Sequence, residues 1–465
     1  MKKYDVVVLG GGPGGYVAAI RAAQLGKCVA LAEKENIGGA CLNTGCIPTK
    51  TLVKNAEILK DAKNSIYRGI HINDISMDIK ETINMKNTVV SQLRHGVEGL
   101  LTANGVDIYK GLATVIDGTC ISIKNGESTE NLGFENLIIA TGSRPAEINI
   151  KGAGENTVTS DELLNMKEIP ESIVIIGGGV IGCEFANILN SFGSKVIVVE
   201  AMPRLIANAD EEMSGALENS MKADGIKVKK GCIVKEVAND GSKKKVILLN
   251  KSGKEENLYA DVVMLSIGRT PNTEGIAALN LEMNGKYIKA DEHMKTSIDN
   301  IYAIGDVTGI KMLAHAASHM GKVAAENISG IDSRYNDEAV PNCIFTSPEL
   351  AFTGLTEGQA AEKYGEINVG RFSLAASGKA LTMGETDGFF KVISDAGTGK
   401  IVGAHLFGAN ATEIIGETAA FIRMGASIDD IADTVHAHPT ISEAFQEAAL
   451  DAVGKCIHMP PKRAN

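Results

Sequence analysis

The stretch Asp5-Val-Val-Val-Leu-Gly10-Gly-Gly12-Pro-Gly-Gly15 decides the fold, because it occurs again as Ser172-Ile-Val-Ile-Ile-Gly177-Gly-Gly179-Val-Ile-Gly182. The same offset carries Glu33 onto Glu200 without a gap. Each copy has the pattern of an apolar strand, a G-x-G-x-x-G turn, a helix rich in Ala, Ile and Leu, and a second strand that ends in Glu. Two such copies in register predict two dinucleotide-binding units of the Rossmann type.

The glycines and the glutamate have separate tasks in such a unit. The first Gly permits the tight turn, the second lets the backbone approach a pyrophosphate, and the third lets helix and strand pack closely. The terminal Glu accepts hydrogen bonds from a ribose. The predicted binding residues are Gly10, Gly12, Gly14, Gly15 and Glu33 in the first unit, and Gly177, Gly179, Val180, Ile181, Gly182 and Glu200 in the second.

Between the two units stands a pair of cysteines, Cys41 and Cys46, with four residues between them. A pair so close in sequence can interconvert between dithiol and disulfide at little loop-closure cost, which suits a reversible two-electron relay. Half of a zinc site is an alternative, but no second Cys or His pair at ligand spacing stands nearby. An inert structural disulfide is the other alternative.

Pro48 argues for the redox interpretation, because proline is favoured in the first turn of a helix. A helix beginning around Ile47 would place Cys46 at its N-terminus, where the helix dipole stabilises a thiolate. Lys50 would share a helix face with Cys46.

The choice of nucleotides follows from Glu200 and from the cysteine pair. A carboxylate at Glu200 would repel the extra phosphate of NADP, so the second unit favours NAD. A reaction with a dithiol between the units has no use for two nicotinamides, so the first nucleotide is interpreted as FAD.

Length and composition exclude several classes of protein. With 465 residues the chain predicts two to four domains, and 44% hydrophobic residues can fill several cores. The net charge of -11 argues against a nucleic-acid or anionic-membrane binder. No stretch approaches the roughly 20 apolar residues of a transmembrane helix. The eight cysteines are scattered, with one close pair, which suits a reducing compartment and a cytoplasmic location.

Further motifs extend the comparison to the whole chain. With the two units and the cysteine pair, the chain resembles the flavin-dependent pyridine nucleotide disulfide oxidoreductases, and within them the members that act on lipoamide. The additional motifs are Ala140-Thr141-Gly142-Ser143, Ser266-Ile267-Gly268-Arg269-Thr270-Pro271-Asn272, Ile301-Tyr-Ala-Ile304-Gly305-Asp306 and His436-Ala437-His438-Pro439-Thr440-Ile441-Ser442-Glu443.

The resemblance implies an α/β fold in which the NAD domain is inserted into the FAD domain and an α+β dimerisation domain follows. The expected bounds are 1–147 and 273–343 for the FAD domain, 148–272 for the NAD domain, and 344–465 for the interface domain. The family is homodimeric through the last of these.

The resemblance also assigns roles to residues. Cys41 is implied as the outer sulfur that exchanges with substrate, and Cys46 as the inner one beside the flavin. Lys50 is expected near the flavin and paired with Glu184. His438 and His436 are both candidate bases; the family motif selects His438, oriented by Glu443. Further flavin contacts are implied at Ala113, Ala140, Thr141, Gly142, Asp306, Met312, Leu313, Ala314 and His315, and NAD contacts at Glu184 and Gly268.

The implied activity is the reoxidation of protein-bound dihydrolipoamide, with FAD and NAD as cofactors and no metal. The expected partner is a lipoyl-bearing protein of a 2-oxo acid dehydrogenase or glycine cleavage system, with no nucleic-acid or membrane partner. A glutathione-type reductase of the same family is one alternative, although those enzymes use NADPH. A non-catalytic assembly flavoprotein is another, although it would not need Cys41, Cys46, His438 and Glu443 together.

Overall fold

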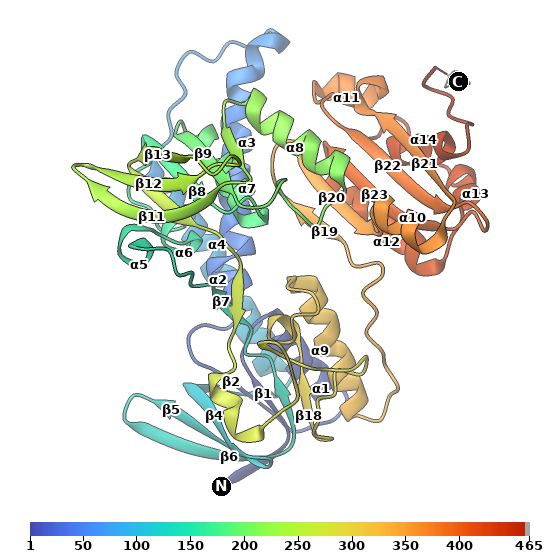
Figure 1. Ribbon diagram of the computed structural model, residues 1–465. Coiled ribbons are helices and arrows are strands. Elements are labelled where there is room, and N and C mark those ends of the chain that lie inside the picture. The colour runs from blue at the N-terminus through green and yellow to red at the C-terminus, as the bar shows by residue number, and fades with distance from the viewer. Residues whose placement is uncertain (461–465) are drawn as a thin grey trace.

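The first dinucleotide-binding unit is built on a seven-stranded sheet in the order β3-β2-β1-β6-β5-β4, with β18 also paired with β6 (Figure 1). The computed structural model describes residues 1–460. Strands β1, β2 and β3 run parallel to each other, as do β1, β6 and β18, whereas β4, β5 and β6 form an antiparallel meander. The strands are β1 (Lys2–Leu9), β2 (Val29–Glu33), β3 (Asp107–Lys110), β4 (Leu112–Asp117), β5 (Cys120–Asn125), β6 (Ser128–Ile139) and β18 (Ile301–Ala303).

Helices α1 (Pro13–Gln24) and α9 (Ala314–Ile328) lie side by side in this unit (Figure 1). Apolar side chains of β1 and β2, among them Val6 and Leu31, are buried in one core with the alanines of both helices. The two helices can approach closely because Gly321 has no side chain; a Cβ at this position would collide with the carbonyl oxygen of Gly14. Helix α9, which follows α1 by some 300 residues in the sequence, thus completes the first unit.

The second unit repeats this plan on a four-stranded parallel sheet, β10-β9-β8-β14, with an antiparallel meander, β11-β12-β13, between β10 and β14 in the sequence. The structural repeat therefore extends beyond Glu33 and Glu200, where the repeat recognised in the sequence ends. Its elements are α5 (Ala153–Asn156), α6 (Ser160–Leu163), β8 (Ser172–Ile176), α7 (Val180–Ser191), β9 (Lys195–Glu200), α8 (Glu211–Ala223), β10 (Lys227–Lys230), β11 (Ile233–Asp240), β12 (Lys243–Leu249), β13 (Glu255–Ala260) and β14 (Val262–Leu265).

The chain crosses between the two units at β7 (Ser143–Pro145) and β15 (Arg269–Pro271), which pair with each other antiparallel. The second unit is therefore inserted into the first, as predicted. The boundaries expected after 147 and 272 fall shortly beyond these two strands and stay predictions.

The C-terminal part is a five-stranded antiparallel sheet, β19-β20-β23-β22-β21, with α12 packed on β20 and β23 and α14 on β21 and β22. Figure 1 shows α8 of the second unit beside this sheet, and apolar residues of α8, β20 and β23 share one core. The elements are β19 (Asn342–Ile344), β20 (Glu349–Gly354), α10 (Glu357–Tyr364), β21 (Ile367–Ser373), η4 (Leu374–Ala376), α11 (Gly378–Met383), β22 (Phe389–Asp395), β23 (Ile401–Gly408), α12 (Ala411–Met424), α13 (Ile428–Asp433) and α14 (Glu443–Ala452). The predicted fold class, two Rossmann-like units and an α+β C-terminal domain, is confirmed.

Helices α3 and α4 pack against each other, and α3 also packs against α7 of the second unit. None of the helices within residues 1–460 is long and apolar enough to cross a membrane. The remaining elements are α2 (Gly39–Thr44), α3 (Cys46–Asn64), η1 (Ser65–Arg68), α4 (Ile79–Ala103), η2 (Glu274–Leu279), β16 (Met283–Asn284), β17 (Tyr287–Ile288) and η3 (Gly305–Thr308).

Candidate active site

The outer glycines of both G-x-G-x-x-G turns are required by close packing. Gly10 and Gly177 have φ values of 103° and 113°, in the left-handed region that favours glycine. A Cβ at Gly15 would collide with the carbonyl oxygen of Gly10, and a Cβ at Gly182 with that of Gly177. The two turns therefore bring helix and strand together in the same way.

The middle glycine of each turn instead borders open space, which fits the pyrophosphate of a dinucleotide. A Cβ at Gly179 would meet nothing within 4 Å, and one at Gly12 nothing nearer than Gly39 Cα at 3.9 Å. These two glycines cap α7 and α1 with no side-chain hydrogen bond, so the first N–H groups of each helix are free to meet an anion. Val180 and Ile181 open α7 here, whereas Gly14 packs against Ala317 of α9.

Glu33 and Glu200 are held by their own turns in matching geometry. Each carboxylate accepts two backbone N–H groups, one from the G-x-G turn and one from the residue two positions further along the chain. The donors are Gly11 (2.7 Å) and Glu35 (2.8 Å) for Glu33, and Gly178 (2.6 Å) and Met202 (2.7 Å) for Glu200. Since each carboxylate oxygen keeps a second lone pair, both groups can still accept ribose hydroxyls.

Several other residues predicted to contact nucleotide follow the C-terminal ends of strands. Ala140, Thr141 and Gly142 follow β6, and Thr141 exchanges hydrogen bonds with Asn272 at 2.7 and 2.9 Å. Asp306 lies in η3 and accepts the Ser143 hydroxyl at 2.5 Å. Gly268 follows β14, with a φ of 112°.

The remaining predicted flavin contacts lie on β4 and at the start of α9. Ala113 is half-buried on β4, in the antiparallel meander. Met312, Leu313 and Ala314 form the start of α9, which also lacks a side-chain cap. His315 is exposed and donates from Nε2 to the Pro341 carbonyl at 2.8 Å, so a flavin contact at 312–315 would come from the backbone N–H groups of the helix.

Cys41 and Cys46 lie on two consecutive helices separated by one glycine. Cys41 is in α2 and Cys46 is the first residue of α3, one position before the expected helix start at Ile47. Gly45 permits this junction, since a Cβ there would stand 2.9 Å from the carbonyl oxygen of Ala40. Both cysteines are free and half-buried.

The pKa values of the two thiols are shifted in opposite directions. The hydrogen bond from the Cys41 thiol lowers the pKa of Cys46 to about 7, and the Lys50 ammonium acts in the same direction against burial. The same hydrogen bond, together with burial, raises the pKa of Cys41. In the reduced pair Cys46 is therefore the thiolate and Cys41 the thiol.

This difference predicts the pH dependence of the reduced protein. Because the pKa of Cys46 is about 7, its thiolate forms as the pH rises from 6 to 8. We expect thiolate absorbance near 240 nm to rise with a midpoint around pH 7 in the reduced protein, and the step to disappear in Cys46→Ser. A midpoint above the ordinary cysteine value of about 8.5 would contradict the assignment.

Lys50 lies one helical turn after Cys46 and pairs with Glu184, as expected. Its Nζ is 2.9 Å from both carboxylate oxygens of Glu184, a residue of α7 whose side chain is only 4% exposed. Two contacts from Phe345 complete the arrangement: its N–H donates to Glu184 at 3.1 Å, and Nζ of Lys50 stands 4.6 Å from its ring centroid. No pattern in the sequence indicated Phe345, which lies in the dimerisation domain.

His438 and Glu443 form the predicted His–carboxylate pair. Nδ1 of His438 lies 2.9 Å from Glu443, whose other oxygen accepts the Thr440 N–H at 2.8 Å. Burial opposes ionisation of Glu443, but the Thr440 and His438 contacts outweigh it and lower its pKa. The His438 side chain is 79% exposed, and within residues 1–460 its Nε2 has no hydrogen-bond partner.

His436, the other candidate base, has both ring nitrogens engaged. Nε2 lies 2.9 Å from Glu417 and Nδ1 lies 3.0 Å from the Thr434 carbonyl, in a side chain that is 4% exposed. The hydrogen bond to Glu417 raises its pKa. Because His436 has no free nitrogen, His438 is the better candidate for proton transfer.

The structure does not bring the cysteine pair and the histidine together within one chain. Figure 1 shows α2 and α14 in separate parts of the molecule. Across the described range, no hydrogen bond or ion pair joins Cys41 or Cys46 to His438.

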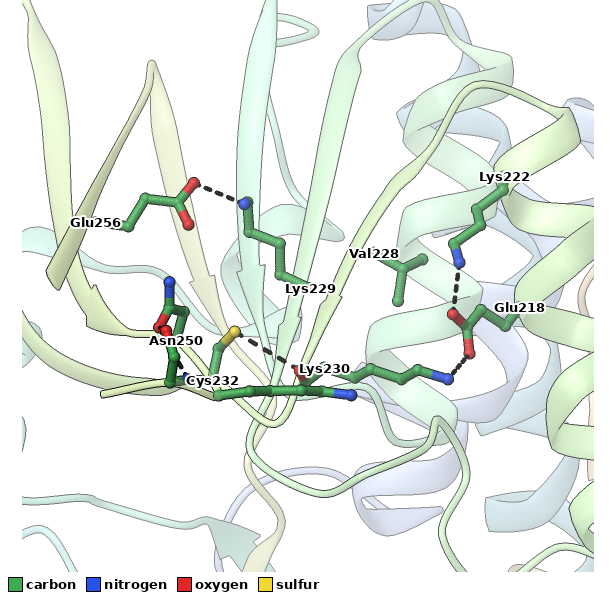
Figure 2. A pocket seen from close by; sticks show the side chains of 10 residues that line it. Glu218, Lys222, Val228, Lys229, Lys230, Cys232, Asn250 and Glu256 are labelled. Atoms are coloured by element: carbon green, nitrogen blue, oxygen red, sulfur yellow. Dashed lines mark hydrogen bonds and ion pairs between the residues drawn. The ribbon is translucent and has the colours of Figure 1, made fainter. Parts of the chain in front are cut away.

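A cavity of about 460 Å³ opens on the second unit and is lined by none of the predicted site residues, although the N–H of Cys232 in its wall donates to the Glu200 carbonyl at 3.0 Å (Figure 2). Four lysines line it, and three of them are paired with carboxylates. The ion pairs are Lys222 and Lys230 with Glu218, and Lys229 with Glu256. Residues 1–460 contain no group of three or more His, Cys, Asp or Glu side chains arranged to hold a metal ion.

Comparison with known proteins covers nearly the whole chain. Residues 4–321 match the pyridine nucleotide-disulphide oxidoreductase family and residues 340–449 its dimerisation domain. The chain is 41% identical to a dihydrolipoyl dehydrogenase of Bacillus subtilis (strain 168), covering 98% of this chain and 99% of the relative. It is 39% identical to that of Geobacillus stearothermophilus (98% of both chains) and 40% identical to that of Chlamydia muridarum (99% of both).

Solved structures give the same fold. The copper(II) complex of the HOCl-induced flavoprotein disulfide reductase RclA from Escherichia coli superposes with a TM-score of 0.87 at 28% identity, covering 97% of this chain and 99% of that one.

Proposed function

The chain belongs to the pyridine nucleotide-disulphide oxidoreductase family, and from this premise we propose that it oxidises protein-bound dihydrolipoamide to lipoamide with NAD as acceptor. Family membership confirms an oxidoreductase that uses FAD and NAD, as the sequence predicted. The observation that carries the proposal is the placement of Cys41 in α2 and of Cys46 at the start of α3, between the two dinucleotide turns in the sequence. Full-length relatives named dihydrolipoyl dehydrogenase support lipoamide as the substrate class.

The first step is a proton transfer to His438 of the partner subunit. That ring has a free Nε2 and is oriented through Nδ1 by Glu443. It accepts a proton from one thiol of dihydrolipoamide, and the resulting thiolate attacks the Cys41 sulfur of the oxidised pair. The Cys41–Cys46 bond breaks, and Cys46 leaves as a thiolate, which its low pKa of about 7 favours.

The second step releases the oxidised substrate. The sulfur of the remaining substrate thiol attacks the first substrate sulfur, which breaks the bond to Cys41, and the proton of that thiol is transferred to the departing Cys41 sulfur. Lipoamide departs, the partner's histidine keeps the proton it took in the first step, and the pair is left with two more electrons than before. FAD would be held by the first G-x-G-x-x-G turn and Glu33, and it would supply the two-electron carrier between Cys46 and NAD.

Glu200 supports NAD rather than NADP as the nucleotide of the second unit. Glu200 ends β9, and its carboxylate is fixed by two backbone N–H groups where we expect a ribose to bind. A 2′-phosphate there would face this negative charge, which counts against a glutathione-type reductase.

The Lys50–Glu184 pair is proposed to tune the flavin site beside Cys46. Glu184→Gln removes the charge that balances Lys50, so the electrostatic environment of Cys46 and the flavin changes. We expect a shifted flavin absorption spectrum and a hydride-transfer rate about tenfold lower, corresponding to roughly 1.4 kcal/mol. Stopped-flow absorbance measures both, and an unchanged spectrum together with an unchanged rate would contradict the role.

The match of residues 340–449 to the dimerisation domain supports a homodimer. The lipoyl-bearing partner would belong to a 2-oxo acid dehydrogenase or glycine cleavage system, and the scattered free cysteines favour a cytoplasmic site of action.

One assay tests the central proposal. The purified protein should be yellow and should reduce NAD when supplied with dihydrolipoamide, and more slowly or not at all when NADP replaces NAD. A colourless protein, or a yellow one that does not oxidise dihydrolipoamide, would refute the proposed reaction.

A further inference from the structure

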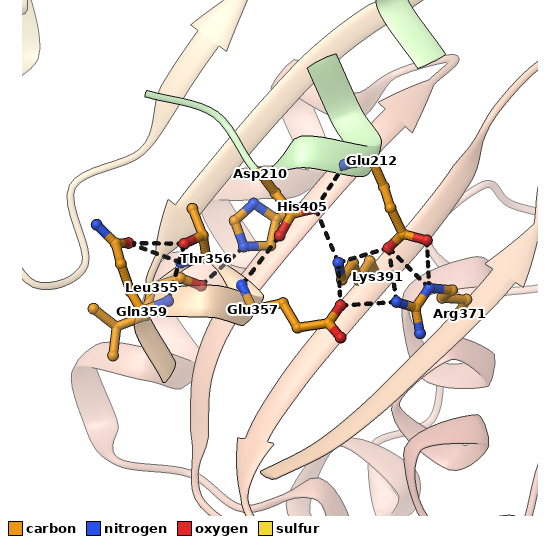
Figure 3. Close-up of polar contacts among 9 residues, drawn as sticks. All are labelled: Asp210, Glu212, Leu355, Thr356, Glu357, Gln359, Arg371, Lys391 and His405. Carbon is orange, nitrogen blue, oxygen red and sulfur yellow. Dashed lines mark hydrogen bonds and ion pairs between the residues drawn. The ribbon is translucent and has the colours of Figure 1, made fainter. Parts of the chain in front are cut away.

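A cluster of charges around a buried lysine joins the second dinucleotide-binding unit to the C-terminal sheet (Figure 3). At its centre is Lys391 of β22, whose side chain is 1% exposed. Its Nζ lies 2.9 Å from Asp210, 2.6 Å from Glu212 and 2.6 Å from Glu357. Burial opposes ionisation of Lys391, but the three carboxylates outweigh it and raise its pKa.

Arg371 of β21 closes the cluster. Its guanidinium lies 2.7 Å from Glu212 and 2.8 Å from Glu357, so three carboxylates share two cations. Asp210 and Glu212 stand at the start of α8, whereas Glu357 begins α10. The cluster is thus an ionic link between two parts of the chain.

The nearby His405 does not contribute a further positive charge. Its Nε2 donates to the Leu355 carbonyl at 2.9 Å, and its Nδ1 is buried without a partner. Burial lowers the pKa of His405.

Residues 201–210 connect β9 to α8 and pack against the G-x-G-x-x-G turn of the second unit; we call this segment the nucleotide loop. Asp210 is its last residue. The loop begins directly after Glu200, and its Met202 N–H holds that carboxylate. Further along, the Ile206 N–H donates to the Gly178 carbonyl at 2.9 Å, and the Leu205 side chain fills the space beside Gly178.

Asp210 fixes the far end of the nucleotide loop in three ways. It caps α8 through the Glu212 N–H at 3.1 Å, accepts the Glu357 N–H at 3.1 Å, and binds Lys391. The nucleotide loop is therefore held at one end by the ribose-binding glutamate and at the other by the C-terminal domain.

We propose that Lys391 and Asp210 are positioning residues for NAD, which act by holding the nucleotide loop and with it Glu200 and the Gly178 turn. This inference rests on the proposed function only in naming NAD as the ligand. No member of the cluster contacts Cys41, Cys46, Lys50 or Glu184, so the dithiol half of the reaction should not depend on it.

The test compares the two half-reactions in the holoenzyme. In Lys391→Met, we expect the Kd for NADH and the KM for NAD to rise about tenfold or more, because a small displacement of binding groups has large effects. The rate at which dihydrolipoamide reduces the bound flavin without NAD should stay within about twofold of wild type. Stopped-flow absorbance and NADH titration give both values.

Two further variants separate positioning from general destabilisation. Lys391→Arg keeps the buried positive charge and should restore most of the NADH affinity. Lys60→Met is the matched control, since Lys60 of α3 also links to the second unit, through Asp224 at 3.1 Å, but does not touch the nucleotide loop. It should leave the Kd for NADH unchanged.

If Lys391→Met does not fold, Asp210→Asn takes its place, because asparagine keeps the cap of α8 while removing the charge. An equal loss in both half-reactions, or an unchanged Kd for NADH in both variants, overturns the positioning role. Failure of the proposed function is seen separately: a wild-type protein that NADH reduces and dihydrolipoamide does not would refute lipoamide as substrate, while the NADH comparison still decides the role of Lys391.

Discussion

Cys41→Ser is expected to abolish the reduction of NAD by dihydrolipoamide, with a loss of at least about 10³-fold. The serine hydroxyl cannot form the mixed disulfide through which the substrate passes its electrons. The G-x-G-x-x-G turns and both ribose-binding glutamates are untouched, so the variant should remain yellow and NADH should still bleach its flavin. Steady-state turnover and NADH-driven bleaching are the two measurements.

A second cysteine provides the control for this result. Cys343 on β19 is also free and half-buried, and it contacts the Thr412 carbonyl rather than the other thiols. Cys343→Ser should keep wild-type turnover. If Cys41→Ser also kept it, the Cys41–Cys46 pair would be a structural feature, and the proposed reaction would be wrong.

The dinucleotide units could be predicted from the sequence because their constraints are local. Gly10, Gly15 and Glu33 must satisfy one tight turn and one strand end, and the same requirements recur at Gly177, Gly182 and Glu200. Proline at position 48 likewise placed the start of α3 within one residue. Contacts of this kind leave a spacing in the sequence that can be recognised.

The antiparallel meander of each unit has no comparable spacing of residues in the sequence. Strands β4 to β6 and β11 to β13 have the same pairing, but several of their residues face solvent, and an exposed strand position accepts many side chains. The repeat was therefore recognised only as far as the two glutamates.

Contacts between distant segments were also beyond the sequence. The ring and the N–H of Phe345 reach Lys50 and Glu184 only because β19 packs beside α7. Lys391 carried a weak signal, a lysine within the apolar run of β22, but its carboxylate partners belong to other elements. The sequence could therefore indicate that this lysine is unusual without identifying its partners.

The placement of His438 leads to the prediction that best tests the dimer. His438→Gln should lower turnover about 10²- to 10⁴-fold near neutral pH, since the substrate thiol loses its base. The loss should be smaller at pH 9, where a thiol with an ordinary pKa of about 8.5 ionises without help. His458→Gln is the matched control, because His458 forms a similar pair with Glu447 of the same helix at 2.7 Å and should be dispensable.

Mixed dimers then show which subunit supplies the histidine. A dimer of one Cys41→Ser chain and one His438→Gln chain contains one intact site if the base comes from the partner subunit, because the intact cysteines and the intact histidine belong to different chains. We expect about half of the wild-type turnover per dimer, although each parent homodimer is inactive. If the histidine acted within its own chain, both sites of the mixed dimer would be defective and it would be as inactive as its parents. That outcome would conflict with the separation of α2 and α14 in the single chain (Figure 1).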